Sequence, residues 1–364
     1  MKNVNDSPVS LVVDGHQDIA WNWLELGRHP AESALAGREG ENGTNIPANT
    51  GRRTVGLPEC LAGRVGVIFA TLFVAPRRAG RGSWRRQTYT TAETAHALAT
   101  EQLDHYKRLA DDEPHVRLIT TAQELEQVVA SWSNSDDSEH LVGLVVSMEG
   151  ADPVREPAEV HQWHAEGLRI IGPAWAATRY AGSASERGPL TQLGRELLAE
   201  MAQVNMALDL SHMAQAACIE AVESYAGPVI ASHSNPRIFH PSDRGLSDDM
   251  IGRLVARDGV VGIVPYNRFL QRGWKTGDPK ELVSIQIVVD AIDHVAQIAG
   301  SSANVGIGSD FDGGFGAESI PAEMDTIADL LLIAEALDGR GYAQEDIERI
   351  MSGNWLRILS RTLP

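Results

Sequence analysis

The sequence has few of the features that mark secreted, disulfide-stabilised or membrane-spanning proteins. Only two of its 364 residues are cysteines, Cys60 and Cys218, which excludes a disulfide framework and gives no indication of a thiolate metal site. No run of about 18 uninterrupted apolar residues occurs, and residues 1–10 lack the apolar core of a signal peptide. We therefore expect no membrane span and a cytoplasmic location.

The chain also lacks an excess of positive charge. It has 31 basic and 49 acidic residues, a formal net charge of −18, which argues against nucleic acid or an anionic membrane surface as its partner. One basic cluster lies in a glycine-containing segment: Arg77, Arg78, Arg81, Arg85 and Arg86. We interpret this cluster as a solvated loop rather than a nucleic-acid-binding patch.

What the sequence does contain is a regular alternation of short apolar runs with longer amphipathic segments. Eight runs rich in Val, Ile and Leu indicate buried parallel strands: residues 11–15, 65–74, 141–148, 169–174, 206–210, 228–232, 260–265 and 304–309. The helix-like segments between them are 91–111, 122–132, 158–167, 190–203, 213–225, 247–258, 282–299 and 322–337. This alternation predicts right-handed crossovers and favours an α/β fold of the TIM type, a (β/α)₈ barrel, over an open doubly wound sheet.

The remaining segments fit around this repeat. Hydrophobic residues make up 43% of the chain, enough for one large core, so we predict a single barrel domain over residues 1–364. Residues 344–361 are expected to form a closing helix pair, and a ninth apolar run at 116–121 is expected to form a short extra strand. Residues 34–56, rich in Gly, Asn and Arg, and residues 133–138 are predicted to be loops.

Side chains suited to metal binding follow five of the eight predicted strands. His16 and Asp18 come directly after the first strand; two positions apart on an extended chain, they point the same way and can chelate one ion. Glu149 follows the third strand, where its two oxygens can bridge two cations. The later strands end in His212, in His233, and in the pair Asp310 and Asp312. Because catalytic residues of such barrels lie at the carboxyl ends of the strands, we expect these groups to meet at one rim.

This ligand set predicts hydrolytic chemistry. Imidazoles together with carboxylates favour zinc, with manganese, iron and cobalt as alternatives. Water is too weakly acidic to attack an amide at neutral pH, and a bound zinc ion lowers its pKa to about 7. A second ion can share the hydroxide and polarise the scissile carbonyl. An acidic residue opposite the ions can then pass the proton to the leaving amine, a role we assign first to Asp310 and second to Asp312.

Five ordered motifs resemble those of the membrane (renal) dipeptidase family, zinc peptidases of the amidohydrolase-like barrel superfamily. They are Asp14-Gly-His-Gln-Asp18, Ser147-Met-Glu-Gly150, Asp209-Leu-Ser-His212, Ser232-His-Ser-Asn235 and Gly308-Ser-Asp-Phe-Asp-Gly313. The likeness runs through nearly the whole chain, including Gly353-Asn-Trp-Leu-Arg357 near its end. It implies a binuclear zinc dipeptidase, and it suggests a homodimer.

The resemblance also implies which residues hold the two zinc ions: His16, Asp18 and Glu149 for one, and Glu149, His212 and His233 for the other. Glu149 would bridge the ions, and Asp310 would be the catalytic acid. Arg244, eleven residues after His233, would bind the substrate carboxylate, which suits a guanidinium because it can donate two parallel hydrogen bonds.

One position departs from the family pattern. The best-known dipeptidases of the family carry a histidine after the fourth strand that contacts the substrate carbonyl, whereas the aligned position here is Trp175. Indole can donate one hydrogen bond but cannot become a cation, so Arg179 and Tyr180 are candidates for the missing donor, and Trp175 is a candidate wall of the substrate site. Loss of such a donor costs about 10²–10³ in rate. The departure therefore bears on efficiency and substrate choice, and not on the metal site.

Three functional hypotheses follow. The leading one is a zinc-dependent dipeptidase that hydrolyses small dipeptides with a metal-activated hydroxide. The alternative, motivated by Trp175, is an amidohydrolase of another small N-acyl amino acid or of a lactone. The third, a non-catalytic metal-binding or scaffold protein, is disfavoured by the complete set of ligands.

Overall fold

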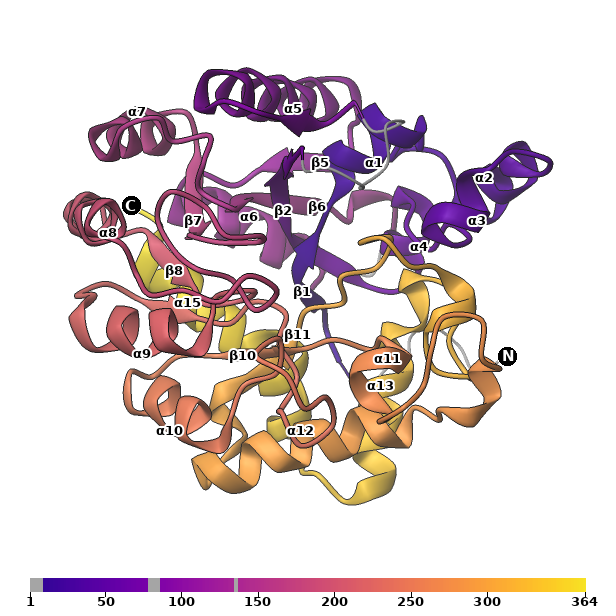
Figure 1. The fold of residues 1–364 in the computed structure, drawn as a ribbon. Helices are drawn as coiled ribbons and strands as arrows, with labels where there is room; N and C mark the ends of the chain where they lie inside the picture. Colours follow the sequence, from indigo (N-terminus) through magenta and orange to yellow (C-terminus); the bar gives the residue numbers. More distant parts are fainter. Residues whose placement is uncertain (1–8, 78–85, 134–136) are drawn as a thin grey trace.

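Eight parallel strands form a barrel at the centre of the structure, a computed structural model that describes residues 9–77, 86–133 and 137–364 (Figure 1). The strands are β1 (Val12–Gln17), β2 (Val65–Phe73), β6 (Val142–Glu149), β7 (Leu168–Gly172), β8 (Ala207–Asp209), β9 (Val229–Ile230), β10 (Val261–Ile263) and β11 (Val305–Ile307). They are hydrogen-bonded in the order β10-β11-β1-β2-β6-β7-β8-β9, and a parallel bridge between Ala231 and Val261 closes the ring. The predicted (β/α)₈ architecture is confirmed.

Helices surround the barrel on all sides in Figure 1. They include α5 (Ala92–Asp112), α6 (Ala122–Ser131), α7 (Val160–Ala165), α8 (Gln192–Gln203), α9 (Gln215–Ser224), α10 (Asp248–Ala256), α12 (Gln286–Ala299) and α13 (Leu331–Arg340). Their apolar faces pack on the outward-facing Val, Ile and Leu side chains of the strands, as the crossovers of a parallel sheet require. No helix in the described ranges is both long and apolar enough to cross a membrane.

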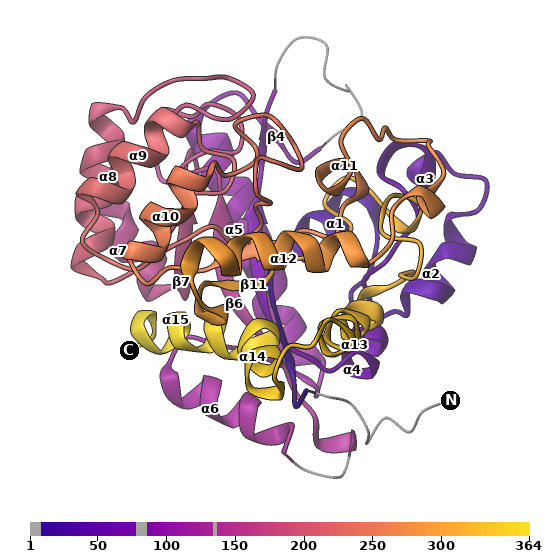
Figure 2. The ribbon, with the colours of Figure 1, turned by 90° about the horizontal axis from the view of Figure 1, so that it is seen from below.

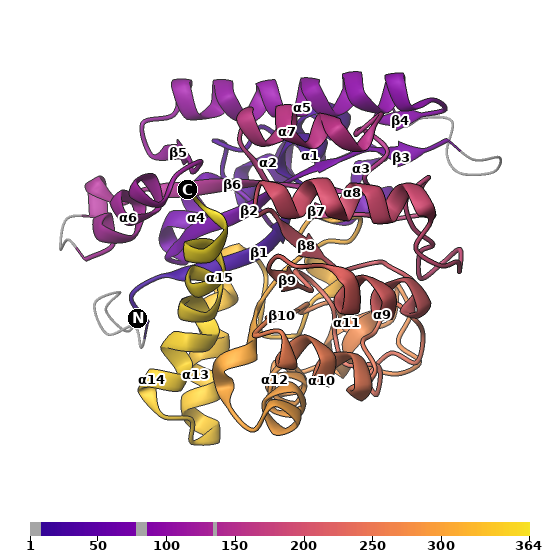
Figure 3. The same cartoon turned by 90° about the vertical axis from the view of Figure 1, so that its left-hand side faces the viewer.

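The two ends of the barrel differ in chemistry. The predicted closing helix pair is wrong: α14 (Gln344–Glu348) and α15 (Asn354–Thr362) are joined by a π-helical stretch (Arg349–Gly353) into one continuous helix, because Gly353 keeps helical backbone angles of −57° and −37°. This helix lies with α6 across the end where the strands begin (Figures 2 and 3). Trp355 of α15 is fully buried there, and its indole N–H donates to the carbonyl of Ile307 at 2.8 Å. Further along the strands the backbones approach closely, since a Cβ on Gly308 would lie only 1.9 Å from the Ser232 carbonyl oxygen. The strand starts are therefore sealed by apolar packing, which leaves the carboxyl ends for polar groups.

The segment between β1 and β2 is helical where a loop is predicted. Within residues 34–56 the structure has α2 (Ala34–Glu41) and α3 (Ile46–Thr50), and these helices lie between α1 (Ile19–Leu26) and α4 (Leu57–Ala62). The loop prediction is wrong because buried arginines, and not an apolar face, order the segment. Arg28 binds Glu41 with two hydrogen bonds of 2.6 and 3.0 Å, and Arg53 donates to the carbonyls of His29 and Glu32.

Other boundaries differ from the predictions more locally. Helix α13 begins at Leu331 and not at 322, because a 3₁₀ turn (Ile327–Leu330) capped by Thr326 precedes it. The expected extra strand is β5 (Val116–Leu118), which pairs with β6 outside the ring, and β3 (Ala75–Pro76) and β4 (Thr88–Tyr89) form a short pair that was not predicted. Arg78, Arg81 and Arg85 of the basic cluster lie outside the described residues, as do residues 134–136 of the predicted 133–138 loop.

Candidate metal centre

Six of the predicted side chains meet at the carboxyl end of the barrel: His16, Asp18, Glu149, His212, His233 and Asp310. His16 lies in β1, Asp18 occupies the N-cap position of α1, and Glu149 is the last residue of β6. His212 and Asp310 follow β8 and β11 in left-handed turns, with φ of 65° and 55°. Such conformations are costly for residues other than glycine and concentrate at functional sites.

The ligand atoms form two overlapping groups that share His16: one with Glu149 and His233, and one with Asp18 and Asp310. Nε2 of His212 and Nε2 of His233 lie 3.1 and 3.2 Å from Oε1 of Glu149. Nε2 of His16 lies 4.0 Å from the same oxygen and 3.7 Å from Oδ1 of Asp18. Oδ1 of Asp310 is 3.8 Å from that imidazole nitrogen. Donor atoms separated by such distances can bind a common cation lying between them.

The chemistry of these atoms fits a metal centre. His16 Nε2, Asp18 Oδ1 and Glu149 Oε1 are buried and have no hydrogen-bond partner among the described residues. Buried polar atoms are nearly always paired, so three unpaired ones close to each other fit a shared cation as their partner. The imidazole and carboxylate donors are those that zinc and related ions prefer.

Neighbouring strands orient the imidazoles. Nδ1 of His233 lies 2.7 Å from Oγ of Ser232, and that hydroxyl donates to Oδ2 of Asp209 at 2.5 Å. Because the serine proton goes to Asp209, His233 carries its own proton on Nδ1, which leaves the lone pair of Nε2 facing the centre. His16 Nδ1 lies 3.2 Å from Oγ1 of Thr71, which contacts Oγ of Ser147 at 3.0 Å in turn, so a hydroxyl pair orients this imidazole. Sequence analysis assigned no role to Thr71, and it included Asp209 and Ser232 only as parts of motifs.

Burial sets the protonation of the cluster. It raises the pKa of Asp18 to about 7. It also raises the pKa values of Glu149 and Asp310 well above the ordinary range, with neighbouring carboxylates adding to the effect. Burial, followed by the charge of Arg244, lowers the pKa of His16 to about 3. The imidazoles are therefore neutral near pH 7 and have lone pairs available for a cation, and the carboxyls require a counter-charge.

Arg244 supplies a guanidinium next to this cluster. Its Nη1 donates to Oγ of Ser234 at 3.0 Å, and its charge centre lies 5.1 Å from the ring of Phe269. Nε and Nη2 are buried and have no partner in the described part of the chain. Burial lowers the pKa of this guanidinium, while the nearby Asp310 and Glu149 partly oppose that shift. Two unpaired donors on one edge of a guanidinium fit a planar anion such as a carboxylate.

The remaining predicted residues lie in different places. The ring of Trp175 is half-buried, 6.3 Å from that of His212 and 4.9 Å from that of Phe73, so it borders the cluster. Arg179 and Tyr180 do not join the cluster within the described residues. Arg179 donates to Asp152 and to the Val154 carbonyl, and the Tyr180 hydroxyl donates to that carbonyl as well. These hydrogen bonds leave Trp175 as the nearer candidate for substrate contact.

Asp312, the second candidate acid, is occupied by other partners. Its Oδ1 accepts from the backbone N–H and the hydroxyl of Thr54, both at 2.8 Å, and lies 3.4 Å from Nη1 of Arg28. Oδ2 accepts from the backbone N–H of Val55 at 3.2 Å. Asp312 thus binds the 52–55 segment, whereas Asp310 lies beside His16.

The fold and this cluster together define a metal-dependent hydrolase built on a (β/α)₈ barrel. The chain belongs to the membrane dipeptidase family, peptidase family M19, whose family model matches residues 7–363. Membership places it among the metallo-dipeptidases, which are hydrolases of peptide bonds, and confirms the resemblance seen in the motifs.

Curated relatives and solved structures agree with this assignment. An uncharacterized dipeptidase of Schizosaccharomyces pombe is 28% identical over 365 residues, which cover 96% of this chain and 80% of the relative. Dipeptidase tcpJ of Claviceps purpurea is 27% identical over 270 residues, or 70% of this chain and 60% of the relative. A metallo peptidase from Rhodobacter sphaeroides, liganded with a phosphinate mimic of the dipeptide L-Ala-D-Ala, has the same fold. The TM-score is 0.77 at 24% sequence identity, and the match covers 98% of this chain and 100% of that chain.

We expect metal binding to release protons and to weaken as the pH falls from about 8 to about 6. The carboxyl of Asp18, with its pKa raised to about 7, and that of Glu149, whose pKa burial raises well above its ordinary range, must lose their protons before they can ligate, and both are increasingly protonated as the pH falls. The imidazoles add little, because a lowered pKa keeps them neutral through this range. Calorimetric titration of metal-free protein with zinc, in two buffers of different ionisation enthalpy, counts the protons released. An affinity that stays constant over this pH range would contradict the expectation.

Proposed function

We propose that this protein hydrolyses dipeptides with two zinc ions, one held by His16, Asp18 and Glu149 and the other by Glu149, His212 and His233. The observation that carries the proposal is a set of three buried ligand atoms without hydrogen-bond partners in the described part of the chain, on His16, Asp18 and Glu149. The Nε2 atoms of His212 and His233 lie within 3.2 Å of Glu149 Oε1. When bound, the ions would acidify a water molecule and polarise the scissile carbonyl. A dipeptide substrate is supported by the family to which the chain belongs.

Arg244 would anchor the substrate. Nε and Nη2 lie on the same edge of the guanidinium and can donate two parallel hydrogen bonds to the C-terminal carboxylate, while Ser234 holds Nη1. Because this anchor lies next to the ligand cluster, only a short distance separates the carboxylate from the bond that is cleaved. That distance selects a dipeptide over a longer peptide, whose carboxylate would lie farther from its first peptide bonds.

Asp310 would move the proton. Its backbone N–H donates to the His16 carbonyl at 3.2 Å, which fixes the residue beside the cluster. Burial raises the pKa of its carboxyl, so the group can hold a proton near neutral pH. In hydrolysis it would accept the proton of the attacking water and donate it to the amine nitrogen as the C–N bond breaks.

The direct test is an assay of purified protein on a panel of L-L, L-D and D-Ala-containing dipeptides. We expect cleavage of some members, loss of that activity on chelation and its recovery with zinc. Asp310→Asn should retain bound metal but lose about 10²–10⁴-fold in kcat, because the proton-transfer group is removed. If no member of the panel is cleaved in a chelator-sensitive way, the dipeptidase proposal fails.

Substitution of the carboxylate anchor should discriminate between substrates. Arg244→Lys keeps the charge but not the bidentate edge, so kcat/KM for a good dipeptide should fall by about 10–100-fold, the value of a charge-assisted hydrogen bond. Hydrolysis of the corresponding dipeptide amide, which lacks the carboxylate, should be slow and nearly equal in both proteins. The control is Arg187→Lys, an exposed arginine paired with Asp243, which should leave both rates unchanged. An equal loss on dipeptide and amide would remove Arg244 from carboxylate binding.

A second candidate function, hydrolysis of another small N-acyl amino acid or of a lactone, is favoured by the apolar wall that Trp175 and Phe73 form beside His212. Trp175→His restores a hydrogen-bond donor, and if the natural substrates are dipeptides their turnover should rise by about tenfold or more. Steady-state kinetics on dipeptides and on N-acyl amino acids measure the change. No gain on dipeptides, combined with rapid turnover of an N-acyl amino acid by the unaltered protein, would favour the second function.

A further inference from the structure

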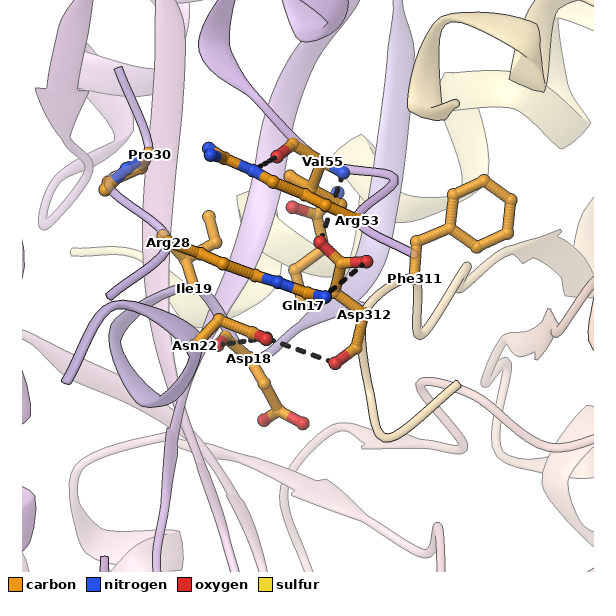
Figure 4. Close-up of a pocket in the computed structure, with 10 residues that line it drawn as sticks. All are labelled: Gln17, Asp18, Ile19, Asn22, Arg28, Pro30, Arg53, Val55, Phe311 and Asp312. Carbon is orange, nitrogen blue, oxygen red and sulfur yellow. Dashed lines mark hydrogen bonds and ion pairs between the residues drawn. The ribbon is translucent and has the colours of Figure 1, made fainter. Parts of the chain in front are cut away.

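A small, partly open pocket, called here the cavity, lies beside the metal centre, between the start of α1 and the turn that carries Asp312 (Figure 4). Its volume is about 20 Å³, close to the space that one water molecule occupies. The polar residues around it include Gln17, Asp18, Asn22, Arg28 and Asp312. The proposed function gives a role to Asp18 and leaves the others unexplained.

Asn22 ties together the two segments that carry the proposed ligand and the proposed acid. Its Nδ2 donates to the Asp18 carbonyl at 3.0 Å and to the Asp312 carbonyl at 3.2 Å, as the dashed lines in Figure 4 mark. Both partners are acceptors, so the amide nitrogen must face them and the orientation of the side chain is determined. Because Asp312 follows Asp310 by two residues, this one amide links the backbone of the ligand Asp18 to the turn that carries the acid.

Three polar atoms of residues lining this cavity have no hydrogen-bond partner among the described residues: Asn22 Oδ1, Gln17 Oε1 and Arg28 Nη1. The three residues are 5%, 1% and 4% exposed, so bulk solvent cannot satisfy these atoms. Two of the atoms are acceptors and one is a donor. A water molecule that accepts from the guanidinium and donates its two protons to the amide oxygens would pair all three.

The outer wall of the cavity is held by the helical segment between β1 and β2. Nε and Nη2 of Arg28 bind both oxygens of Glu41, and Nη2 also donates to the Gly51 carbonyl at 2.7 Å. Asp312, 3.4 Å from Arg28 Nη1, is fixed by Thr54. Arg28 is therefore held in place by Glu41 and Gly51, and its Nη1, which faces Asp312 at ion-pair distance without a hydrogen bond, presents a donor at a defined position.

We propose that Asn22 is a positioning residue for the metal centre and that Gln17 and Arg28 hold one buried water against it. Together they set the separation between Asp18 and the turn that carries Asp310. The inference rests on the proposed metal centre, since it assigns these residues to the geometry of a ligand and an acid. It also gives the 34–56 segment a function, because its residues hold Arg28 and Asp312 in place.

The test compares two substitutions of similar size. Asn22→Leu removes both the donor and the acceptor, and Asn22→Asp keeps the shape but presents a carboxylate to two carbonyl oxygens. We expect kcat to fall by about 10–100-fold with KM nearly unchanged, and zinc release to a chelator to speed up by about tenfold, as for other groups that orient metal ligands. Asn22→Asp should be the more severe change, because repulsion pushes the two segments apart.

The matched control is Asn49→Leu. Asn49 lies on α3, is exposed, and makes the same kind of bond, from Nδ2 to the carbonyl four residues earlier, at 2.9 Å. Its substitution should leave kcat and zinc release unchanged. The proposal would be overturned if both Asn22 variants had the kcat and the zinc-release rate of the wild-type protein. It would also be overturned if Asn22→Asp had a milder effect than Asn22→Leu, because packing alone predicts that order.

Two further measurements keep the test independent of the dipeptidase assay. Zinc release is followed without substrate, so a protein that binds zinc but cleaves no dipeptide still reports on Asn22, whereas failure of the proposed function shows only in the dipeptide panel. Should the variants not fold, a high-resolution crystal structure of the unaltered protein decides the matter. Density for one ordered water between Asn22, Gln17 and Arg28 supports the inference, and a dry cavity overturns it.

Discussion

The main constraint on this fold is that it must keep several ionisable side chains together in a buried site. The guanidinium of Arg244 neutralises the charges of these side chains only in part. A charge that is removed from water needs a counter-charge or hydrogen bonds to compensate for the lost solvation. Few such partners are close to Asp18, Glu149 and Asp310, so burial raises the pKa values of these three carboxyls. The cluster is therefore unfavourable by itself and cannot be what holds the surrounding chain in place. The barrel must supply the rigidity, and a bound cation is the natural partner for the charges it gathers.

That rigidity comes from small polar residues that cross-link neighbouring strand ends. Asp14 in β1 accepts from both the backbone N–H and the hydroxyl of Ser309 beyond β11, at 2.6 and 2.5 Å. Asp209 in β8 does the same for Ser232 after β9, at 2.9 and 2.5 Å. Each of these bonds lies within a few residues of a proposed ligand or of the acid, so the frame fixes backbone positions before any ion is bound. Apolar packing around Trp355 then secures the opposite end of the same strands.

The sequence was sufficient for the parts of the site that follow strand geometry. An apolar run followed by His16 and Asp18 predicts a strand end with two side chains on one side, and the structure has both beside Glu149. It was insufficient where the local backbone is unusual. Asp310 and Asp312 both have positive φ, 55° and 63°, and the turn sends one carboxylate to His16 and the other to Thr54, a choice that spacing alone leaves open.

Segments ordered by charged groups were also beyond prediction. Apolar periodicity is the main sequence signal for a helix, and residues 34–56 lack it. This segment is stabilised by the buried side chains of Arg28 and Arg53, which are 4% and 1% exposed, in place of an apolar core. The positions of Arg179 and Tyr180 are likewise determined by polar partners elsewhere in the chain. Their spacing after β7 suggests the site, but the 152–155 segment offers a carboxylate and several carbonyls that bind them instead. Where polar partners lie in the folded chain is a property of tertiary structure, and no local pattern reports it.

Substrate selection is separable from metal chemistry in this architecture. Arg244 lies on the loop between β9 and α10 and is held by Ser234, the neighbour of His233, so the carboxylate anchor is placed relative to a ligand. Trp175 lies on the loop after β7 and packs on Phe73, which is in register with Glu149, but only through ring contacts. A change at position 175 therefore alters the wall of the site without breaking a hydrogen bond to the cluster, whereas the unpaired N–H groups of Arg244 can donate two parallel hydrogen bonds to a carboxylate. In the proposed function, recognition of a carboxylate is therefore the fixed element of substrate binding, and the side chain beside Trp175 is the variable one.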